Sequence, residues 1–342
     1  GCSSSYTAGF PSVDMGEPPP DAGMFQPMLT GVGLAVPGGQ RGLAVADLDK
    51  DSLPDVVVTL PYDGKLAILW SPGAPGTQKT TLITVPGTPY GLTLVDLNHD
   101  QVADLAFTDP ATGTLNVFFT RSFWVSRDTP FTTTQPVSYP LGQGVSVVQA
   151  GLLNGDDDPD LAVLNTKDGT VSVLVSAGAA GMYAFTDSKA RVFPGLSHYS
   201  LSLVPSLIPK AADVLVTSAT DDTLTFLRNS GTGSLTVDQT AAGTYATARG
   251  PVFVTEVTQP APATSTVYVA ASSGNLLQRW TSGQGQLTAR PAVGTAVQPV
   301  ALAVDDLNLD AAPDLVAVSS DRNELKVLLS AATGAYPESS TL

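Results

Sequence analysis

Apolar and polar positions along the chain form a block that recurs. Its clearest form is an apolar strand, a nine-residue acidic loop and a second apolar strand, as in VADLDKDSLPDVVV at residues 45–58. Similar copies read VDLNHDQVADLAF (95–107), GLLNGDDDPDLAV (151–163) and VDDLNLDAAPDLVAV (304–318), and two weaker ones end in ADVLVTS (212–218) and TVYVAAS (266–272). Short apolar runs bounded by turn residues are typical of β-strands, so the pattern predicts strand pairs joined by loops.

A second pattern follows each block: a tight turn, an apolar strand and a turn of small residues. Equivalent turn positions are occupied by Gly64, Gly113, Gly169, Asp222, Gly274 and Asn323, which are spaced 49, 56, 53, 52 and 49 residues apart. A fourth, more polar strand follows, for instance TTLITVP at residues 80–86. Four antiparallel strands per unit of about 50 residues are the pattern of a propeller blade. We therefore predict an all-β fold, a six-bladed β-propeller, with a seven-bladed ring as the alternative.

The segments near the two ends of the chain are candidates for the outer strand of the sixth blade. The segment FQPMLTGVG (residues 25–33) resembles the outer strands found elsewhere, and the last repeat continues into a short polar tail. We expect residues 25–33 to complete the sixth blade. Residues 1–23 are rich in Ser and Pro and predict a flexible tether. Residues 24–342 are expected to form one propeller domain.

The net charge of the chain argues against one class of binding partner, nucleic acid. The chain of 342 residues has 31 acidic and 16 basic residues and a formal charge of −15. This charge repels phosphate backbones, so we expect no nucleic-acid partner. About half of the acids lie in the four acidic loops, and four bound Ca²⁺ ions would offset about half of the net charge.

Cys2 is the single cysteine and lies in Gly1-Cys2-Ser3, which resembles the lipidated junction of a bacterial lipoprotein. A stray cysteine beside a cloning remnant is the alternative. Lipidation would attach the protein to a membrane only through acyl chains, and we expect an extracytoplasmic protein, an outer-membrane lipoprotein on the surface or periplasmic side.

The acidic loops are candidate calcium sites. In the loop that starts at Asp47, carboxylates at positions 1, 3, 5 and 9 can converge on one point, and the carbonyl of position 7 can face inward. Such oxygens suit Ca²⁺, which takes 6 to 8 of them at about 2.3 to 2.6 Å. A solvated polar loop without metal is the alternative.

The predicted ligands follow this spacing in four loops, and we expect three to four Ca²⁺ ions. In the first loop they are Asp47, Asp49, Asp51, Leu53 and Asp55, and in the second Asp96, Asn98, Asp100, Val102 and Asp104. In the third they are Asn154, Asp156, Asp158 and Asp160, and in the sixth Asp306, Asn308, Asp310, Ala312 and Asp314. Leu152 replaces the first ligand of the third loop, so binding there should be weaker. The fourth and fifth repeats lack the alternating acids.

At these loops the chain resembles the FG-GAP/VCBS repeat family, the propellers that include the integrin α-subunit head. The resemblance covers about residues 25–335 and implies calcium ligation by the loop D-x-[DN]-x-D-G-x-x-D. It departs from the family at position 6, where the family has Gly and this chain has Ser52, Gln101, Asp157 and Ala311. Family members are often seven-bladed.

Three classes of function are compatible with this fold. The first is a surface binding or scaffold module that contacts protein or glycan at the cell envelope, in adhesion or assembly. The second is an accessory subunit of an envelope machine for secretion, motility or outer-membrane assembly. The third is a polysaccharide-active enzyme, which we do not expect because His99 and His198 lie in different repeats and no G-x-S-x-G motif is present.

The longest repeat spacing comes from an insertion in the second blade that includes SFWVSRDTPF (residues 122–131). Arg121, Phe123 and Trp124 concentrate there, and aromatic and Arg side chains are common interface anchors. We expect these three residues to contact the partner. Packing of the aromatic residues under their own loop is the alternative. Trp70 and Trp280, at equivalent third-strand positions, are expected to be packing residues.

Overall fold

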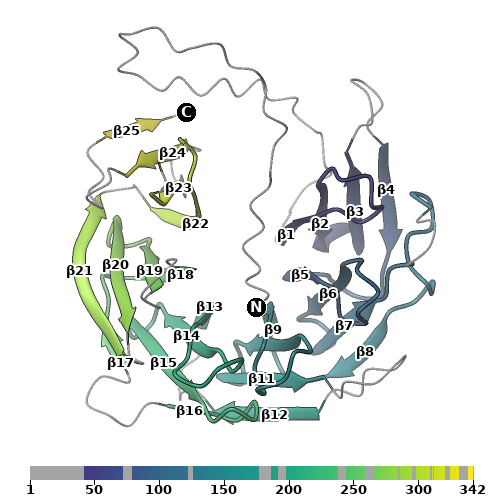
Figure 1. Cartoon of the computed structure of the whole chain (residues 1–342), viewed down its shortest axis with the longest axis horizontal. Coiled ribbons are helices and arrows are strands. Elements are labelled where there is room, and N and C mark those ends of the chain that lie inside the picture. The colour runs from purple at the N-terminus through teal and green to yellow at the C-terminus, as the bar shows by residue number, and fades with distance from the viewer. Residues whose placement is uncertain are drawn as a thin grey trace, which may run out of the picture.

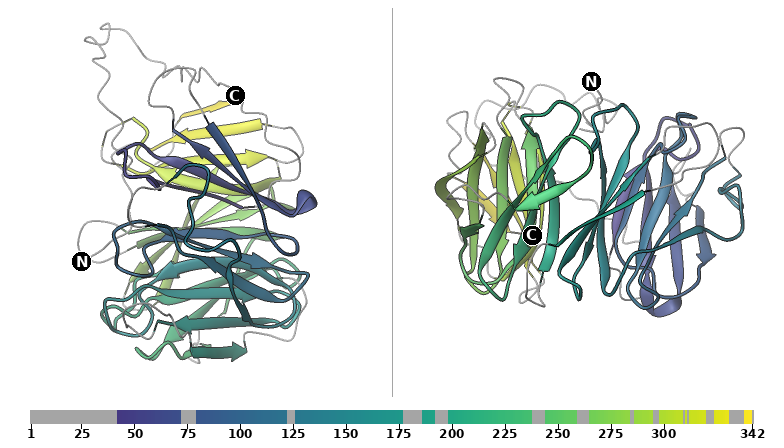
Figure 2. Two further views of the ribbon diagram at one scale, coloured as in Figure 1. Left: turned by 90° about the vertical axis from the view of Figure 1, so that its right-hand side faces the viewer. Right: turned by 90° about the horizontal axis from the view of Figure 1, so that it is seen from below.

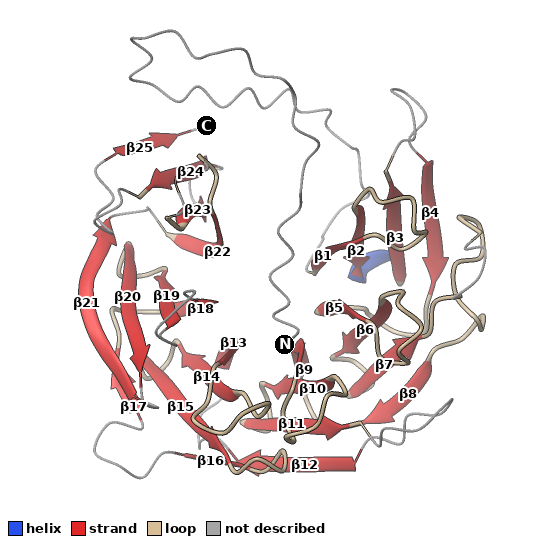
Figure 3. Ribbon diagram, in the orientation of Figure 1, coloured by secondary structure: helices blue, strands red, loops and turns tan. Residues whose placement is uncertain are grey.

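Six antiparallel sheets are arranged around a common centre (Figures 1 and 2). The computed structural model describes residues 42–71, 79–121, 126–176, 186–191, 198–237, 244–258, 265–283, 286–294, 298–308, 310, 312–319, 324–330 and 338–341. The predicted six-bladed propeller is thereby confirmed, rather than the seven-bladed alternative. The only helical turn among these residues is η1 (Pro61–Asp63), a short 3-10 turn (Figure 3). Within the same ranges, no helix has the length and apolarity needed to cross a membrane.

Each blade is built from strands that follow one another along the chain. Blade 1 contains β1 (Leu43–Ala46), β2 (Asp55–Leu60), β3 (Lys65–Trp70) and β4 (Lys79–Thr84). Blade 2 contains β5 (Leu92–Val95), β6 (Asp104–Asp109), β7 (Thr114–Phe118) and β8 (Val137–Pro140). Blade 3 contains β9 (Val145–Gly151), β10 (Asp160–Asn165), β11 (Thr170–Val175) and β12 (Thr186–Arg191).

The second half of the ring follows the same order. Blade 4 contains β13 (His198–Val204), β14 (Asp213–Ser218), β15 (Thr223–Asn229), β16 (Leu235–Val237) and β17 (Thr244–Ala246). Blade 5 contains β18 (Pro251–Thr258), β19 (Ser265–Ala271), β20 (Leu276–Gly283) and β21 (Gln286–Gly294). Blade 6 contains β22 (Pro299–Asp305), β23 (Asp314–Ser319), β24 (Glu324–Leu329) and β25 (Glu338–Thr341). Blade 4 departs from four strands because β16 and β17 both pair with β15.

The predicted turns lie between the second and third strands of the blades. Gly64, Gly113 and Gly169 have φ of 58°, 71° and 60°, and Asp222 has φ of 54°. In blade 5 the positive φ falls on Asn275 rather than on Gly274. Asp and Asn tolerate this left-handed conformation better than other non-glycine residues, which explains why they replace glycine in these turns.

The sixth blade ends differently from our expectation. Its outer strand is β25, which pairs Lys326 with Thr341 and Leu329 with Glu338. The prediction that residues 25–33 complete this blade is therefore wrong for the strand beside β24, and residues 25–33 themselves lie outside the described residues. An outer strand is held mainly by its backbone hydrogen bonds, so the polar segment 338–341 can form it.

The core lies between the blades. Trp70 is fully buried in the cluster between blades 1 and 2, and Trp280 is buried between blades 4 and 5. Both tryptophans are packing residues, as predicted. Burial of such side chains contributes about 1.5–3 kcal/mol each. Phe118 adds an aromatic stack between blades 1 and 2, with Phe131 at a centroid distance of 4.4 Å.

Candidate metal centre

The acidic loops connect the first and second strands of their blades, and three neighbouring loops touch one another. The four acidic loops are loop 1 (residues 47–55), loop 2 (96–104), loop 3 (152–160) and loop 6 (306–314). Lys50 in loop 1 donates to the carbonyl of Asp100 in loop 2 at 3.3 Å. His99 in loop 2 lies 2.6 Å from Asp158 in loop 3. The loops of blades 1, 2 and 3 therefore lie side by side around the ring.

The aspartate at position 9 of each acidic loop is fully buried and bonded to backbone. Asp55 accepts the N–H of Leu48 at 2.9 Å and that of Ser71 at 2.8 Å. The same pair of bonds recurs at Asp104 with Leu97 and Thr120, at Asp160 with Leu153 and Ser176, and at Asp314 with Leu307 and Ser330. This aspartate joins the start of its loop to the end of the third strand.

Blade 4 keeps this aspartate although its loop lacks the other acids. Asp213 is buried and accepts the N–H of Asn229 at 2.7 Å. The ninth residue therefore has a structural role that does not depend on the rest of the acidic pattern. The acidic spacing along the sequence indicates a ligand role for this residue and gives no signal of the structural one.

Position 5 shapes the turn at the tip of each acidic loop. Its carboxylate accepts the backbone N–H of position 7 in all four loops, at 2.8 or 2.9 Å. The pairs are Asp51 with Leu53, Asp100 with Val102, Asp156 with Asp158 and Asp310 with Ala312. The predicted position-7 residues are thus placed by their own N–H groups.

The side chain at position 3 accepts the N–H of position 5. The acceptors are Asp49, Asn98, Asn154 and Asn308. Positions 1 and 6 are also linked, since Asp47 accepts the N–H of Ser52 at 2.9 Å and Asp96 that of Gln101 at 2.8 Å. Asp306, at position 1 of loop 6, accepts the N–H of Asp310 at 3.0 Å.

The residues that replace glycine at position 6 of loops 1 and 2 adopt a strained backbone conformation. Ser52 has φ of 69° and Gln101 has φ of 67°. These angles lie in the left-handed region that the family glycine would occupy without strain. The two loops thus keep the curled geometry that a glycine at position 6 allows.

Burial raises the pKa values of the aspartates at position 9 of the acidic loops. Desolvation raises the pKa of Asp55 to about 6, that of Asp104 to about 7 and that of Asp160 to about 6, from an ordinary value of 3.8. Neighbouring carboxylates of the same loop raise these pKa values further, while the two backbone hydrogen bonds lower them. A cation in the loop would oppose the rise, because it favours the charged form.

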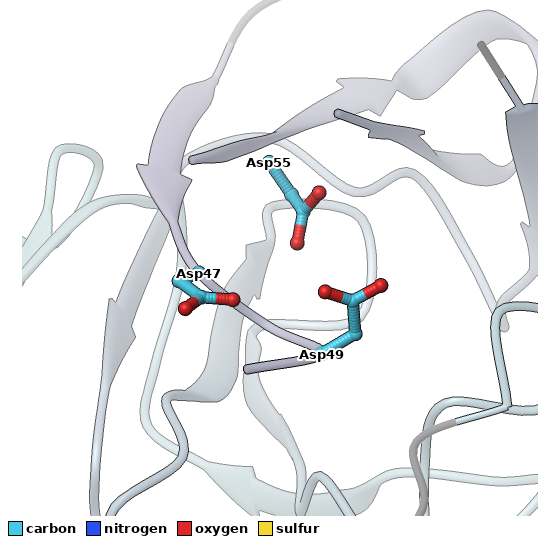
Figure 4. A group of neighbouring side chains, drawn as sticks. All are labelled: Asp47, Asp49 and Asp55. Atoms are coloured by element: carbon cyan, nitrogen blue, oxygen red, sulfur yellow. The ribbon is translucent and has the colours of Figure 1, made fainter. Parts of the chain in front are cut away.

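Loop 1 brings three predicted ligands together. Oxygen atoms of Asp47, Asp49 and Asp55 lie within 4.8 Å of one another, and the side chains point toward a common centre (Figure 4). One oxygen of this group, Asp47 Oδ1, is buried and has no hydrogen-bond donor among the described residues. Hard oxygen donors and an acceptor without a donor fit a Ca²⁺ ion.

Asp51, the fourth predicted carboxylate of loop 1, lies outside this group and bonds Arg127 instead. The predicted ligands of loops 2, 3 and 6 follow the same turn, but their carboxylates do not form such a group within the part of the chain that the structure describes. In loop 3, Asn154 donates to Asp156, and in loop 6, Asn308 donates to Asp310 at 3.1 Å.

Three basic side chains on this face were missed by the sequence analysis as partners of the loops. His99 of loop 2 pairs with Asp158 and is about half exposed. Lys210 of blade 4 pairs with Asp157 at 2.6 Å. Arg127, in the blade-2 insertion (residues 119–136, between β7 and β8), reaches loop 1. No short-range sequence signal indicates these pairs, since the partners lie 50 to 80 residues apart.

The blade-2 insertion is partly integrated into the ring. Arg121 donates from Nε to the carbonyl of Phe131 at 2.9 Å. Phe131 is buried in the hydrophobic cluster between blades 1 and 2. Phe123 and Trp124 lie outside the described residues, so their contact with a partner stays a prediction, as does lipidation of Cys2.

Comparisons with known proteins agree with this architecture. Residues 47–107 match the family model for the FG-GAP-like repeat. No curated protein matches the chain by sequence. A functionally unknown protein from Desulfotomaculum acetoxidans is similar in structure, with a TM-score of 0.60, 13% identity and coverage of 90% of this chain and 86% of that one.

Two further similar structures are of proteins that bind a known partner. A structure of BBS1N in complex with ARL6DN aligns with a TM-score of 0.58 and 17% identity, over 83% of this chain and 77% of that one. A lectin from Agrocybe aegerita that recognises non-reducing terminal N-acetylglucosamine aligns with a TM-score of 0.57 and 13% identity, over 87% and 79%. At these identities the likeness shows the fold alone. The chain is thus a six-bladed β-propeller in which residues 47–107 match the FG-GAP-like repeat.

Proposed function

We propose that the protein is a calcium-stabilised extracytoplasmic module that binds protein or glycan, in adhesion or assembly at a bacterial envelope. The fold itself suggests a binding or scaffold role. One observation supports calcium binding. Three carboxylates converge in loop 1, and one of their oxygens is buried without a hydrogen-bond donor among the described residues.

Calcium would act here through Asp47, Asp49 and Asp55. A bound ion would neutralise carboxylates that otherwise repel one another, and it would tie β1 and β2 together. Loops 2, 3 and 6 have the same backbone turn with Asn at position 3, and we propose them as weaker sites. Ions that bind only the folded state stabilise it by mass action.

Binding rather than catalysis is the role we propose. The aspartates at position 9 accept backbone hydrogen bonds, and His99 is paired with the carboxylate of Asp158. Two similar folds bind a protein and a sugar, respectively, which makes either class a reasonable partner. An accessory subunit of an envelope machine is the alternative, and it differs in having one obligate partner.

The extracytoplasmic setting and the lipid on Cys2 belong to this proposal. A mass measurement of the protein from its native membrane would show the added acyl chains on the peptide that contains Cys2. An unmodified Cys2 in that peptide would contradict the lipid anchor and leave the calcium proposal standing.

Thermal melting tests the calcium proposal. We expect the melting temperature to rise by several degrees from excess chelator to millimolar Ca²⁺. Asp47→Asn should reduce this rise, whereas Asp63→Ala, an exposed aspartate in the turn at η1, should leave it unchanged. A melting temperature that is the same with chelator and with Ca²⁺ would contradict the metal assignment.

A further inference from the structure

The guanidinium of Arg127 lies in the acidic loop of the neighbouring blade. Its Nε donates to Asp49 at 2.5 Å and its terminal nitrogen donates to Asp51 at 2.8 Å. It also lies 5.7 Å from the ring centroid of Trp70 on β3. Only about a quarter of the side chain is exposed, so this is a partly buried bidentate contact.

Two further contacts, at the Arg127 carbonyl and at Asp128, fasten the insertion to blade 1. The hydroxyl of Thr81 on β4 donates to the carbonyl of Arg127, and Trp70 donates to the same hydroxyl at 2.9 Å. Lys79 on β4 pairs with Asp128 at 2.6 Å. The position of Arg127 is therefore set by blade 1 and not only by its own insertion.

Loop 1 differs from the other acidic loops in the residue that Arg127 contacts. Position 3 is Asp49 in loop 1, but it is an asparagine in the other three: Asn98, Asn154 and Asn308. Among the described residues, positions 3 and 5 of those three loops have no arginine partner. Arg127 thus offsets the one carboxylate that loop 1 carries beyond the ligand set of loops 2 and 6.

The contact also affects which carboxylates converge. Asp47, Asp49 and Asp55 lie together, whereas Asp51 turns to Arg127 and stays outside the group. A cation that used position 5 would have to draw Asp51 away from the guanidinium. The positive charge of Arg127 would also repel a cation at the centre of the group.

We propose that Arg127 competes with the cation for the carboxylates of loop 1. Arg127 binds Asp49 and Asp51 when no cation is present, and it releases Asp51 when a cation binds. This inference rests on the proposed calcium function and adds its regulation. In the metal-free protein the Arg127 contact joins blades 1 and 2. Loop 1 therefore binds calcium more weakly than its four carboxylates alone would allow.

Calorimetric titration with Ca²⁺ alone tests the competition in wild type, Arg127→Gln and the matched control Arg121→Gln. Arg121 belongs to the same insertion, but its Nε bonds a backbone carbonyl away from loop 1. We expect one site to bind Ca²⁺ at least tenfold more tightly in Arg127→Gln. In Arg121→Gln all sites should match wild type.

The fluorescence of Trp70 assigns this change to blade 1. Wild-type and Arg127→Gln proteins are compared in a background with Trp124→Phe and Trp280→Phe, which leaves Trp70 as the one tryptophan. The calcium-dependent change in its emission should shift to lower Ca²⁺ by the same factor. If Arg127→Gln does not fold, Arg127→Lys should shift it in the same direction by less, since lysine cannot span two carboxylates with a planar fork.

The outcomes separate the two proposals. If wild type binds Ca²⁺ and the Trp70 midpoint is unchanged or moves to higher Ca²⁺ in Arg127→Gln, the competition is wrong and the calcium function stands. If neither protein binds Ca²⁺, both proposals are wrong. A tenfold tightening that appears equally in Arg121→Gln would also overturn the role of Arg127, because it would come from loosening the insertion.

Discussion

The carboxylate of Asp213 accepts the backbone N–H of Asn229 at 2.7 Å, in a blade whose loop lacks the acidic pattern. The equivalent bond in blade 1 joins Asp55 to Ser71 at 2.8 Å, beside three further carboxylates. One residue type at one position therefore serves blades with and without a candidate metal site. Structural and metal-binding roles can be separated by comparing these blades.

Asp213→Ala should destabilise the protein by about 2 kcal/mol, because it leaves a buried N–H without its charged acceptor. The loss should be the same in chelator and in Ca²⁺. Urea unfolding under both conditions measures it. Asp104→Ala removes the equivalent position-9 aspartate from an acidic loop and should lose more stability in Ca²⁺ than in chelator. A calcium-dependent loss for Asp213→Ala would contradict the separation of roles.

The metal-free protein should lose stability as the pH rises from about 4 to 7. The pKa values of Asp55, Asp104 and Asp160 are raised in the folded state, so folding favours their protonated forms. This stabilisation is fully present below their unfolded pKa near 4, and it is lost as the pH passes through about 6 to 7. The melting temperature in chelator should therefore be higher at pH 5 than at pH 7.5.

Added Ca²⁺ should reduce this pH dependence, since the ion favours ionised carboxylates and protons compete with it at low pH. The stabilisation by Ca²⁺ should be larger at pH 7.5 than at pH 5. Repetition in 0.5 M NaCl is the control, because salt screens the general repulsion of an acidic protein more than it affects buried groups. A melting temperature in chelator and salt that rises with pH would show that the three aspartates do not behave as described.

Ser52→Gly should stabilise the protein by about 0.5 to 1 kcal/mol. Ser52 holds φ of 69°, which is unfavourable for a residue with a Cβ, and its hydrogen bond to Asp47 uses only the backbone N–H. Denaturant unfolding in chelator measures the gain. Ser52→Ala is the control, because it removes the hydroxyl but keeps the Cβ. Equal effects of Gly and Ala would show that the conformation is not the cause.

Replacing both Phe123 and Trp124 by Ala should weaken capture of the partner from an envelope extract by tenfold or more, with the melting temperature nearly unchanged. The reason is their setting in the blade-2 insertion, which also carries the exposed residue Asp128. Intact capture by this variant would place the contact surface elsewhere on the ring.

Phe131→Ala is the counterpart within the same insertion. Phe131 is buried and stacked on Phe118, so its truncation should cost about 3 to 5 kcal/mol of stability. If the variant with Ala at positions 123 and 124 melts as early as Phe131→Ala, the two aromatic residues are core residues rather than partner contacts.

Much of the fold could be predicted from local pattern. Repeats of about 50 residues indicate six blades because each blade pairs strands that are close in the chain. The turn at Gly64 and the curl of loop 1 follow from local hydrogen bonds and backbone conformation. The same holds for the burial of Trp70 on an apolar strand.

The sequence by itself determined the six blades, the acidic loops and the residue types able to hold a cation. Only the tertiary structure decided that β25 forms the outer strand of blade 6, that Asp213 bonds Asn229, and that Arg127 occupies loop 1. The last of these joins residues 76 and 78 positions apart. Such partners are chosen by how neighbouring blades pack, and charge complementarity alone does not single out one arginine among the 16 basic residues of the chain.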